Sequence, residues 1–246
     1  MALQLNLEKS AQKLVLSLEK SGITPPKLDV AFGLDVSGSF EDEHLKGVTN
    51  QLLARLLPWG LVFDPDRKID MFTFSNGAAH VQEVGAVNEQ NYENFVRSRI
   101  VGKVAGWNGG TDYSYLVERM LQSFGWTDTV KKVSLFGRML GQKDQVVQGA
   151  RRRSLAIVVT DGDNMDKPRT MDVLRQSEAR GDQVYFLFIG ISNQGSSFPF
   201  LERIGDTFGN TGFVAVPNLR QFVEMDDDAL NQALLNEELL DWLAGR

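Results

Sequence analysis

Three short segments of the sequence carry side-chain oxygens that could bind a metal ion. In the first, DVSGS at residues 35–39, Asp35 offers a carboxylate, and Ser37 and Ser39 offer hydroxyls within one turn. Such oxygens suit Mg²⁺ or Mn²⁺, and neutral hydroxyls among them leave the ion with uncompensated positive charge. When this segment is taken alone, a turn whose Asp or Ser caps the next helix explains it equally well.

The other two segments lie far from the first along the chain. Thr111 follows two glycines in GGTD and precedes a helical pattern, so its hydroxyl could either bind a metal or cap that helix. Asp161 opens the turn DGDN directly after an apolar run. Because residues of these types also form ordinary turns, neither segment identifies a site by itself.

The elements that would position these residues alternate between strands and helices. Nearly continuous apolar runs predict buried strands, whereas apolar residues at intervals of three and four predict helices. The predicted strands span residues 28–34, 68–74, 154–160, 183–189 and 213–216, with a short partner at 79–84. The predicted helices span residues 44–57, 92–101, 113–121 and 168–180. This alternation predicts an α/β fold with a doubly wound, mainly parallel sheet and helices on both faces.

In such a sheet, ligands bind at the carboxyl ends of the strands. Asp35 and Asp161 each follow a long buried strand, so both should lie at that edge, and Gly38 would permit a tight backbone path between the serines. Together with Thr111, these segments resemble the metal-ion-dependent adhesion site of von Willebrand factor A (vWA) domains, which consists of DxSxS, a distant Thr and a distant Asp. The resemblance runs from about Leu28 to Glu224.

This resemblance implies a role for each of the five residues. It implies that Ser37 and Ser39 bind the ion directly and that Thr111 does so in at least one state. The carboxylates of Asp35 and Asp161 would bind directly or through water. The implied cofactor is Mg²⁺ or Mn²⁺, with Ca²⁺ as a further alternative. The implied partner is a protein whose Asp or Glu completes the coordination of the metal.

Two longer phrases of the sequence point to a narrower group. LNLEKSAQKLVLSLEKSGI near the N-terminus and VAFGLDVSGSF around Asp35 are similar to bacterial intracellular vWA proteins of tellurium-resistance systems and, more distantly, to copine A domains. Phe40 stands where members of the family often have Met. The similarity implies a nonenzymatic interaction module in a bacterial stress or tellurium-resistance system.

The composition limits the kind of metal site. The chain contains no cysteine, which excludes a disulfide framework and thiolate ligands. It contains only two histidines, His44 and His80, and neither has partners at ligand spacing, so we expect both on the surface or in packing. Any metal must therefore be held by oxygen.

Charge and hydropathy limit the surroundings of the chain. A hydrophobic fraction of 42% with 24% charged residues is typical of a globular protein with a large core. A formal net charge of -6 argues against nonspecific binding to nucleic acid. Residues 1–20 mix acidic and basic residues with apolar ones, unlike a signal peptide, and no apolar run could span a bilayer. We therefore expect a cytoplasmic protein without a membrane span.

The whole chain, residues 1–246, is expected to form a single vWA-type domain. In this interpretation residues 1–24 are an N-terminal helical extension, residues 25–225 are the core, and residues 226–246 are a C-terminal helix.

The two terminal helices carry recognisable end signals. Ser21 and Gly22 should stop the first helix, and Asp226 or Asp227 should begin the last one. The alternative for the N-terminus is a strand that would use Leu3, Leu5 and Leu7.

One stretch, residues 124–153, fits the alternating pattern poorly. It could hold a surface helix that carries Val130, Val133, Phe136 and Leu140. It also contains a basic cluster made of Lys131, Lys132, Arg138, Lys143 and Arg151 to Arg153. We expect this cluster to be a solvated face rather than a phosphate-binding surface. The three arginines would then act as charged gatekeepers, which reduce aggregation of the hydrophobic strand that follows them.

Two other functions compete with the interaction module. A metal-dependent phosphoester hydrolase is the enzyme alternative, although the sequence shows no clear general base beside the site and no GxSxG or P-loop motif. An RNA-associated scaffold that uses residues 131–153 is the second. Trp107, next to the Thr111 loop, could form a rim for a ligand or be a buried aromatic that fixes the loop. We expect an interaction module and no enzyme.

Overall fold

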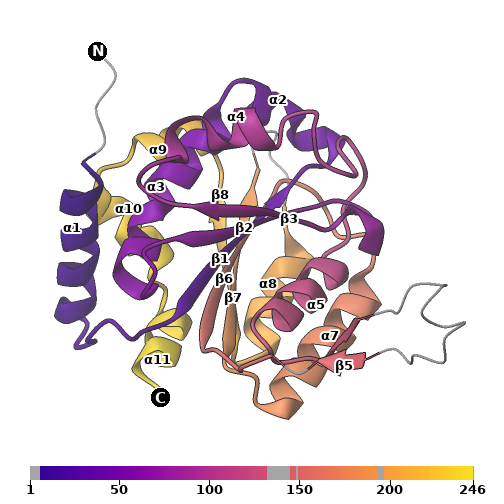
Figure 1. Cartoon of the computed structure of the whole chain (residues 1–246). Coiled ribbons are helices and arrows are strands. Elements are labelled where there is room, and N and C mark those ends of the chain that lie inside the picture. Colours follow the sequence, from indigo (N-terminus) through magenta and orange to yellow (C-terminus); the bar gives the residue numbers. More distant parts are fainter. Residues whose placement is uncertain (1–5, 132–144, 148, 193–196, 246) are drawn as a thin grey trace, which may run out of the picture.

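The centre of the protein is a six-stranded sheet, seen in a computed structural model that describes residues 6–131, 145–147, 149–192 and 197–245 (Figure 1). Its strands are β1 (Asp29–Asp35), β2 (Ile69–Phe74), β3 (Gln82–Val87), β6 (Ser154–Thr160), β7 (Val184–Ile191) and β8 (Thr211–Val216). Their order is β3-β2-β1-β6-β7-β8, and all neighbours are parallel except β3, which is antiparallel to β2. The predicted fold class is therefore confirmed.

The central strands are buried on both faces, which explains their continuous apolar runs. In β1, Val30 and Phe32 point into one core and Ala31 into the other, as the two-residue repeat of a strand requires. Every residue of β6 and β7 is buried. A parallel sheet needs such cover on both sides, because the connections between its strands are helices that pack on its faces.

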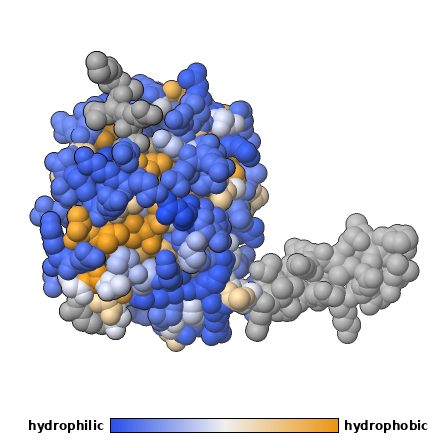
Figure 2. All heavy atoms as spheres, turned by 60° about the vertical axis from the view of Figure 1, so that its left-hand side comes forward, coloured by the Kyte–Doolittle hydropathy of each residue, from blue (hydrophilic) through white to orange (hydrophobic). Residues whose placement is uncertain are grey.

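Two layers of helices provide this cover (Figure 1). One face packs against α1 (Leu7–Lys20), α3 (Val48–Phe63), α4 (Phe95–Arg99), α9 (Leu219–Glu224), α10 (Asp227–Leu234) and α11 (Glu237–Ala244). The other face packs against α5 (Ser114–Ser123), α7 (Lys167–Arg180) and α8 (Pro199–Thr207). The face of the molecule in Figure 2 is largely hydrophilic, with hydrophobic residues gathered in one area.

The predicted helix at residues 44–57 is replaced by two helices. A short helix, α2 (Glu41–Leu45), ends before Gly47, whose φ of 75° is left-handed and breaks the regular path. The next helix, α3, starts at Val48 and continues through Pro58 to Phe63. The apolar pattern predicts one helix here because only two residues, Lys46 and Gly47, separate α2 from α3.

Other edges also differ from the sequence prediction. The partner strand β3 begins at Gln82 rather than residue 79, because residues 78–80 form a 3₁₀ turn. The predicted helix at 92–101 is a 3₁₀ turn, Tyr92–Asn94, followed by the short α4. Neither α8 nor α9 was predicted, since both are short.

The terminal helices confirm some of the predicted ends and correct others. Helix α1 stops at Ser21, and Gly22 then has a φ of 74°. Asp226 caps α10 by accepting a hydrogen bond from the backbone N–H of Ala229 at 2.8 Å. The single predicted C-terminal helix is two helices, because Asn236 starts α11 as a new N-cap. The proposed strand residues Leu3 and Leu5 lie outside the described residues.

The stretch at residues 124–153 contains strands where a helix was predicted. Val130 lies in β4 (Thr129–Lys131), which pairs antiparallel with β5 (Gln145–Val147), so the predicted helix is wrong at that position. The other predicted helix residues, Val133, Phe136 and Leu140, lie outside the described part of the chain, as do Lys132, Arg138 and Lys143.

The predicted solvated face holds for Arg151, which is exposed, whereas Arg152 and Arg153 are partly buried. Arg151 lies over the ring of Trp126, with 5.4 Å between guanidinium carbon and ring centroid, and Arg153 lies over Trp242 at 4.4 Å. Arg152 forms an ion pair with Asp29. These contacts attach Arg152 to β1 and Arg153 to α11, so packing accounts for these two arginines.

No helix in the described part of the chain is long and apolar enough to cross a membrane.

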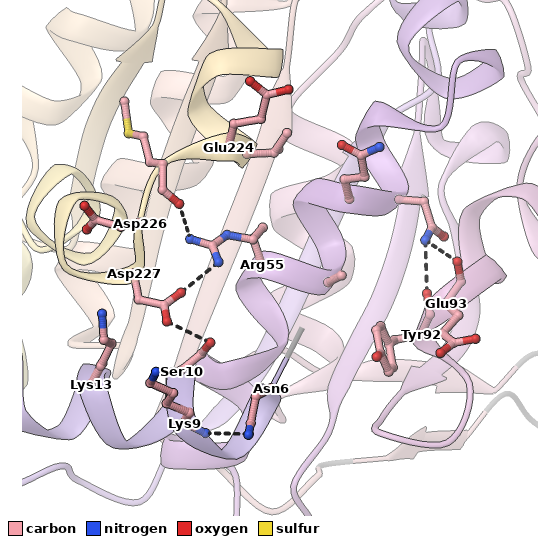
Figure 3. A pocket seen from close by; sticks show the side chains of 15 residues that line it. Asn6, Lys9, Ser10, Lys13, Arg55, Tyr92, Glu93, Glu224, Asp226 and Asp227 are labelled. Atoms are coloured by element: carbon pink, nitrogen blue, oxygen red, sulfur yellow. Dashed lines mark hydrogen bonds and ion pairs between the residues drawn. The ribbon is translucent and has the colours of Figure 1, made fainter. Parts of the chain in front are cut away.

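A polar cluster joins α1, α3 and α10 along a surface groove (Figure 3). Arg55 of α3 donates hydrogen bonds to Oδ1 of Asp227 and to the carbonyl of Met225, both at 2.7 Å. The hydroxyl of Ser10 on α1 donates to the second oxygen of Asp227 at 3.0 Å. The side chains of Arg55 and Asp227 are only 12% and 18% exposed, so their ion pair is poorly screened by water.

We predict that Arg55→Ala lowers the free energy of unfolding by about 2 kcal/mol, because Asp227 then loses its charge partner in a mostly buried setting. Urea denaturation followed by circular dichroism measures this change. Lys9→Ala is the matched control, since Lys9 lines the same groove but is exposed, and it should change the free energy by less than about 0.5 kcal/mol. Equal effects of the two substitutions would contradict the assigned role of Arg55.

Candidate metal centre

At the carboxyl edge of the sheet, the strand order makes a switch point between β1 and β6, and we call the region outside the ends of these two strands the crevice. β1 and β6 are neighbours, yet the chain continues from β1 to α3 on one face and from β6 to α7 on the other. At such a switch point the two connections diverge and leave room for a ligand. Asp35 is the last residue of β1, and Asp161 follows the last residue of β6. The topology therefore brings the two carboxylates to the same crevice.

The five residues predicted to hold a metal lie together there. The backbone N–H of Ser37 donates to Oδ1 of Asp35 at 2.8 Å, and the hydroxyls of Ser37 and Ser39 are 3.3 Å apart. Ser39 donates to Oδ1 of Asp161 at 2.8 Å. The hydroxyl of Thr111 lies 3.4 Å from Oδ2 of Asp35. The structure thus brings together three segments that are far apart in the sequence, while metal binding itself remains a prediction.

The helix-capping alternatives do not describe these residues. Helix α5 begins after Tyr113, and no side chain caps it, so Thr111 is not its N-cap. Helix α2 also begins without a side-chain cap, after Phe40. The oxygens of Asp35 and Thr111 are directed into the crevice instead.

The cluster has a buried floor and an open mouth. Asp35 is completely buried, and Ser37 and Thr111 are 3% and 4% exposed. Ser39 is exposed, and Asp161 is partly exposed. An ion held here would therefore be enclosed by protein on one side and accessible from solvent on the other.

The two carboxylates are in an unfavourable electrostatic setting. Burial, together with the negative charges of Asp35 and Glu43, raises the pKa of Asp161 to about 7, against the lowering effect of the hydrogen bond from Ser39. Burial also raises the pKa of Asp35 to about 6, against the effect of hydrogen bonds from Thr160, Ser37 and Thr111. Ionisation of both groups in this crevice is costly, and a divalent cation would remove that cost.

The donor set fits a hard cation that accepts neutral oxygens. Among the described residues, no group of three or more His, Cys, Asp or Glu side chains could hold a metal ion. A metal in this crevice must therefore combine the two carboxylates with hydroxyls and water, as Mg²⁺ and Mn²⁺ do.

Two residues beneath the cluster were not identified from the sequence. The hydroxyl of Thr160 donates to Oδ2 of Asp35 at 2.6 Å. The hydroxyl of Tyr113, which is buried, donates to the carbonyl of Gly162 at 2.6 Å. Thr160 thus orients the carboxylate of Asp35, and Tyr113 fixes the turn after Asp161. The only sequence signal for Thr160 was its position at the end of a strand, directly before Asp161.

His44 holds the other side of the cluster. It is 1% exposed, and burial lowers its pKa to about 4, so its ring is neutral. Its Nε2–H donates to the carbonyl of Asp35 at 2.9 Å, and Nδ1 accepts from the hydroxyl of Thr49 at 3.0 Å. Trp107, which is partly buried, packs against the ring with 5.4 Å between centroids. Both aromatic side chains therefore fix the loops around Asp35.

The loop before Thr111 is tightly attached to its neighbours. Ser37 forms a bridge with Gly109, and the N–H of Gly38 donates to the Gly109 carbonyl at 3.0 Å. A Cβ atom on Gly109 would lie 2.5 Å from Oδ1 of Asn76. Gly38, which was predicted to permit a tight backbone path, has room for a side chain, since a Cβ there would have only ordinary contacts, the nearest at 3.5 Å. The close approach occurs in the Thr111 loop instead.

Comparison with known proteins places this architecture among vWA folds. Over 240 residues the chain is 24% identical to "Uncharacterized protein YcbR" of Bacillus subtilis (strain 168), which covers 95% of this chain and 84% of that protein. Proximal thread matrix protein 1 from the mussel byssus superposes with a TM-score of 0.54 at 13% identity, over 89% of this chain and 47% of that one. The chain thus spans about half the length of the mussel protein.

The N-terminal domain of TFIIH p34 superposes with a TM-score of 0.50 at 12% identity, over 81% of this chain and 95% of that domain. At these identities the two structural likenesses show the fold alone. The sequence itself matches a family model described as "vWA found in TerF C terminus" over residues 27–246, a range that contains all five residues of the cluster. By this match over most of its length, the chain belongs to the vWA-TerF-like family.

Proposed function

We propose that this chain is a metal-dependent interaction module that holds one divalent cation in the crevice between β1 and β6. The observation that carries the proposal is the hydrogen-bonded cluster of three hydroxyl-bearing residues, Ser37, Ser39 and Thr111, with two carboxylates whose pKa is raised. The ligands would be Asp35, Ser37, Ser39, Thr111 and Asp161, directly or through water. Mg²⁺ and Mn²⁺ fit this donor set best.

The open mouth of the crevice supports binding to an acidic side chain. A cation held by two carboxylates and neutral hydroxyls keeps an attraction for a further anion, and its solvent side lies between Ser39 and Asp161. The bound cation supplies one coordination position for a carboxylate of a protein partner. The five residues would hold the cation, Thr160 orients Asp35, and Ser39 and Asp161 keep exposed surface on that side.

We further propose that the module binds rather than catalyses. Both ring nitrogens of His44, the histidine next to the cluster, are engaged in internal hydrogen bonds, so His44 is not placed to act as a base. The family match to a TerF-type vWA domain supports a setting in a bacterial stress or tellurium-resistance system. Purified protein with Mn²⁺ should leave a phosphoester substrate unchanged, and metal-dependent turnover would favour the hydrolase alternative.

Asp35→Asn should weaken binding of Mn²⁺ by about 100-fold or more, because it removes a buried anionic ligand while keeping the size of the side chain. Without metal, the melting temperature should be unchanged or higher, since a costly buried carboxylate is lost. Asp163→Asn is the control, because Asp163 lies nearby but is exposed and paired with Lys167 at 2.6 Å. Calorimetry that finds wild-type affinity in Asp35→Asn would overturn the assigned ligand.

Metal binding should depend strongly on pH. The pKa of Asp35 is about 6 and that of Asp161 about 7 without metal, so protons compete with the cation below pH 7. We expect the affinity to fall by roughly tenfold per pH unit for each carboxylate that must lose a proton, and to level off above pH 8. Calorimetry in two buffers of different ionisation heat would show the released protons.

The stability of the metal-free protein should follow the same carboxylates. Between the ordinary pKa of 3.8 and the raised values, these two carboxylates bind more protons in the folded state, so they lower the free energy of unfolding as pH rises from about 4 to 7. The lowered pKa of His44 acts in the opposite direction, but with one group against two. A chelated protein that gains stability over this range would contradict the raised pKa values.

Binding of a carboxylate should require both the metal and Thr111. The probe is an immobilised Gly-Ser peptide with one central Asp, compared with the same peptide carrying Asn. Chelation should abolish the difference between them. Thr111→Ala should weaken binding of the Asp peptide more than binding of Mn²⁺, because Thr111 has the longest contact to Asp35 in the cluster, at 3.4 Å, and can join the ion as the carboxylate arrives. Surface plasmon resonance measures both, and equal binding of the two peptides in Mg²⁺ would place the interaction elsewhere.

A further inference from the structure

Met165 is an apolar side chain held in the open beside the candidate metal centre. It is 73% exposed, more than the other exposed large apolar side chains of the described residues, which are Leu16, Leu45 and Met225. Exposure of a single apolar side chain is common, so only its contacts with neighbouring residues can indicate a function.

The backbone of Met165 is fixed to the loop that carries Thr111. Its N–H donates to the Thr111 carbonyl at 2.9 Å. The preceding residue, Asn164, is buried and accepts hydrogen bonds from the backbone N–H groups of Tyr113 at 3.3 Å and Asp166 at 3.1 Å. A rigid turn therefore presents the exposed thioether, and chain flexibility does not account for its position.

The thioether lies directly over the glycine before Thr111. A Cβ atom on Gly110 would be only 2.8 Å from Sδ of Met165, so the side chain rests on the loop of one predicted ligand. Met165 itself belongs to the turn that starts at Asp161, the ligand at the mouth. Met165 therefore stands next to two of the loops that carry predicted ligands, the loop of Thr111 and the turn after Asp161.

The rest of the mouth carries negative charge. Glu43 lies close enough to Asp161 to raise its pKa, whereas Asp42 of the same helix is paired with Lys46. A second acidic side chain on the partner would be repelled here by the negative charge of Glu43. An apolar side chain that packs on Met165 would instead be stabilised, because both side chains would bury apolar surface.

We propose that the partner of this site presents a single acidic residue with apolar residues next to it in sequence, and that one of these apolar side chains covers Met165. This inference rests on the proposed metal-dependent function and adds the chemistry of the partner. Adjacent residues are about 3.8 Å apart along a chain, so the neighbour of a bound acid reaches the rim of the crevice. Methionine suits this role because its unbranched, polarisable side chain adapts to differently shaped apolar groups.

The test uses four Gly-Ser peptides that differ only at their centre, which reads Leu-Asp-Leu, Gly-Asp-Gly, Glu-Asp-Glu or Leu-Asn-Leu. Affinities are measured with Mg²⁺ on the full chain, as wild type and as Met165→Gln. In the wild type, Leu-Asp-Leu should bind about five-fold more tightly than Gly-Asp-Gly, and Glu-Asp-Glu should bind most weakly of the three acidic peptides. In Met165→Gln the advantage of Leu-Asp-Leu should disappear, while Gly-Asp-Gly and Mn²⁺ bind as before.

The outcomes separate this inference from the function on which it rests. Equal affinities of Leu-Asp-Leu and Gly-Asp-Gly in the wild type would overturn it, as would a leucine advantage that survives in Met165→Gln. If Leu-Asn-Leu binds as tightly as Leu-Asp-Leu, the carboxylate is not recognised and the proposed function itself fails. Leu16→Gln serves as the control variant, because Leu16 is 54% exposed but lies on α1, which packs against α3 and α10.

Discussion

The burial of the Asp35 carboxylate at the end of the central strand is the constraint on which the rest of the structure depends. An ionised group without water is expensive, and here a second carboxylate, Asp161, is linked to it through the hydroxyls of Ser37 and Ser39. The surrounding donors only reduce that cost, since burial still raises the pKa of both groups. A cation would balance the charge. The cluster is thus a place where positive charge is favourable, and it is exposed to solvent at Ser39.

The sheet makes this arrangement possible because β1 and β6 are neighbours whose connections leave on opposite faces. The surrounding loops are then locked by short contacts. Thr160 orients Asp35 from below, His44 holds its carbonyl, and Met165 links the turn after Asp161 to the Thr111 loop. These contacts hold the candidate ligands in place, and such ordering lowers the entropy that binding must overcome.

The sequence predicted the parts of this picture that depend on regular patterns. The strand at residues 154–160 was placed correctly, because a fully buried run bounded by polar residues has few alternatives. The five candidate ligands were identified because they occur at strand or loop ends in a recognisable order. Their convergence could only be expected, since it depends on which strands become neighbours.

Features that depend on tertiary contacts could not be predicted. The break at Gly47 and the new cap at Asn236 divide helices whose apolar stripes continue across them. The stacking of Arg153 on Trp242 joins residues far apart in sequence, so the arginines looked like a charged surface. The role of Thr160 was hidden because a threonine at the end of a strand has no pattern of its own. In each case a long-range contact decided the outcome, and periodicity does not encode such contacts.

The most direct test of the account is an X-ray structure of the protein crystallised with Mn²⁺, with data collected for the anomalous signal of the metal. The account predicts one anomalous peak in the crevice, with the hydroxyl oxygens of Ser37 and Ser39 about 2.2 Å from it and a water at its solvent side. An empty crevice in crystals that contain Mn²⁺ at millimolar concentration, or a peak held by other residues, would contradict the claim that this domain acts through a bound metal.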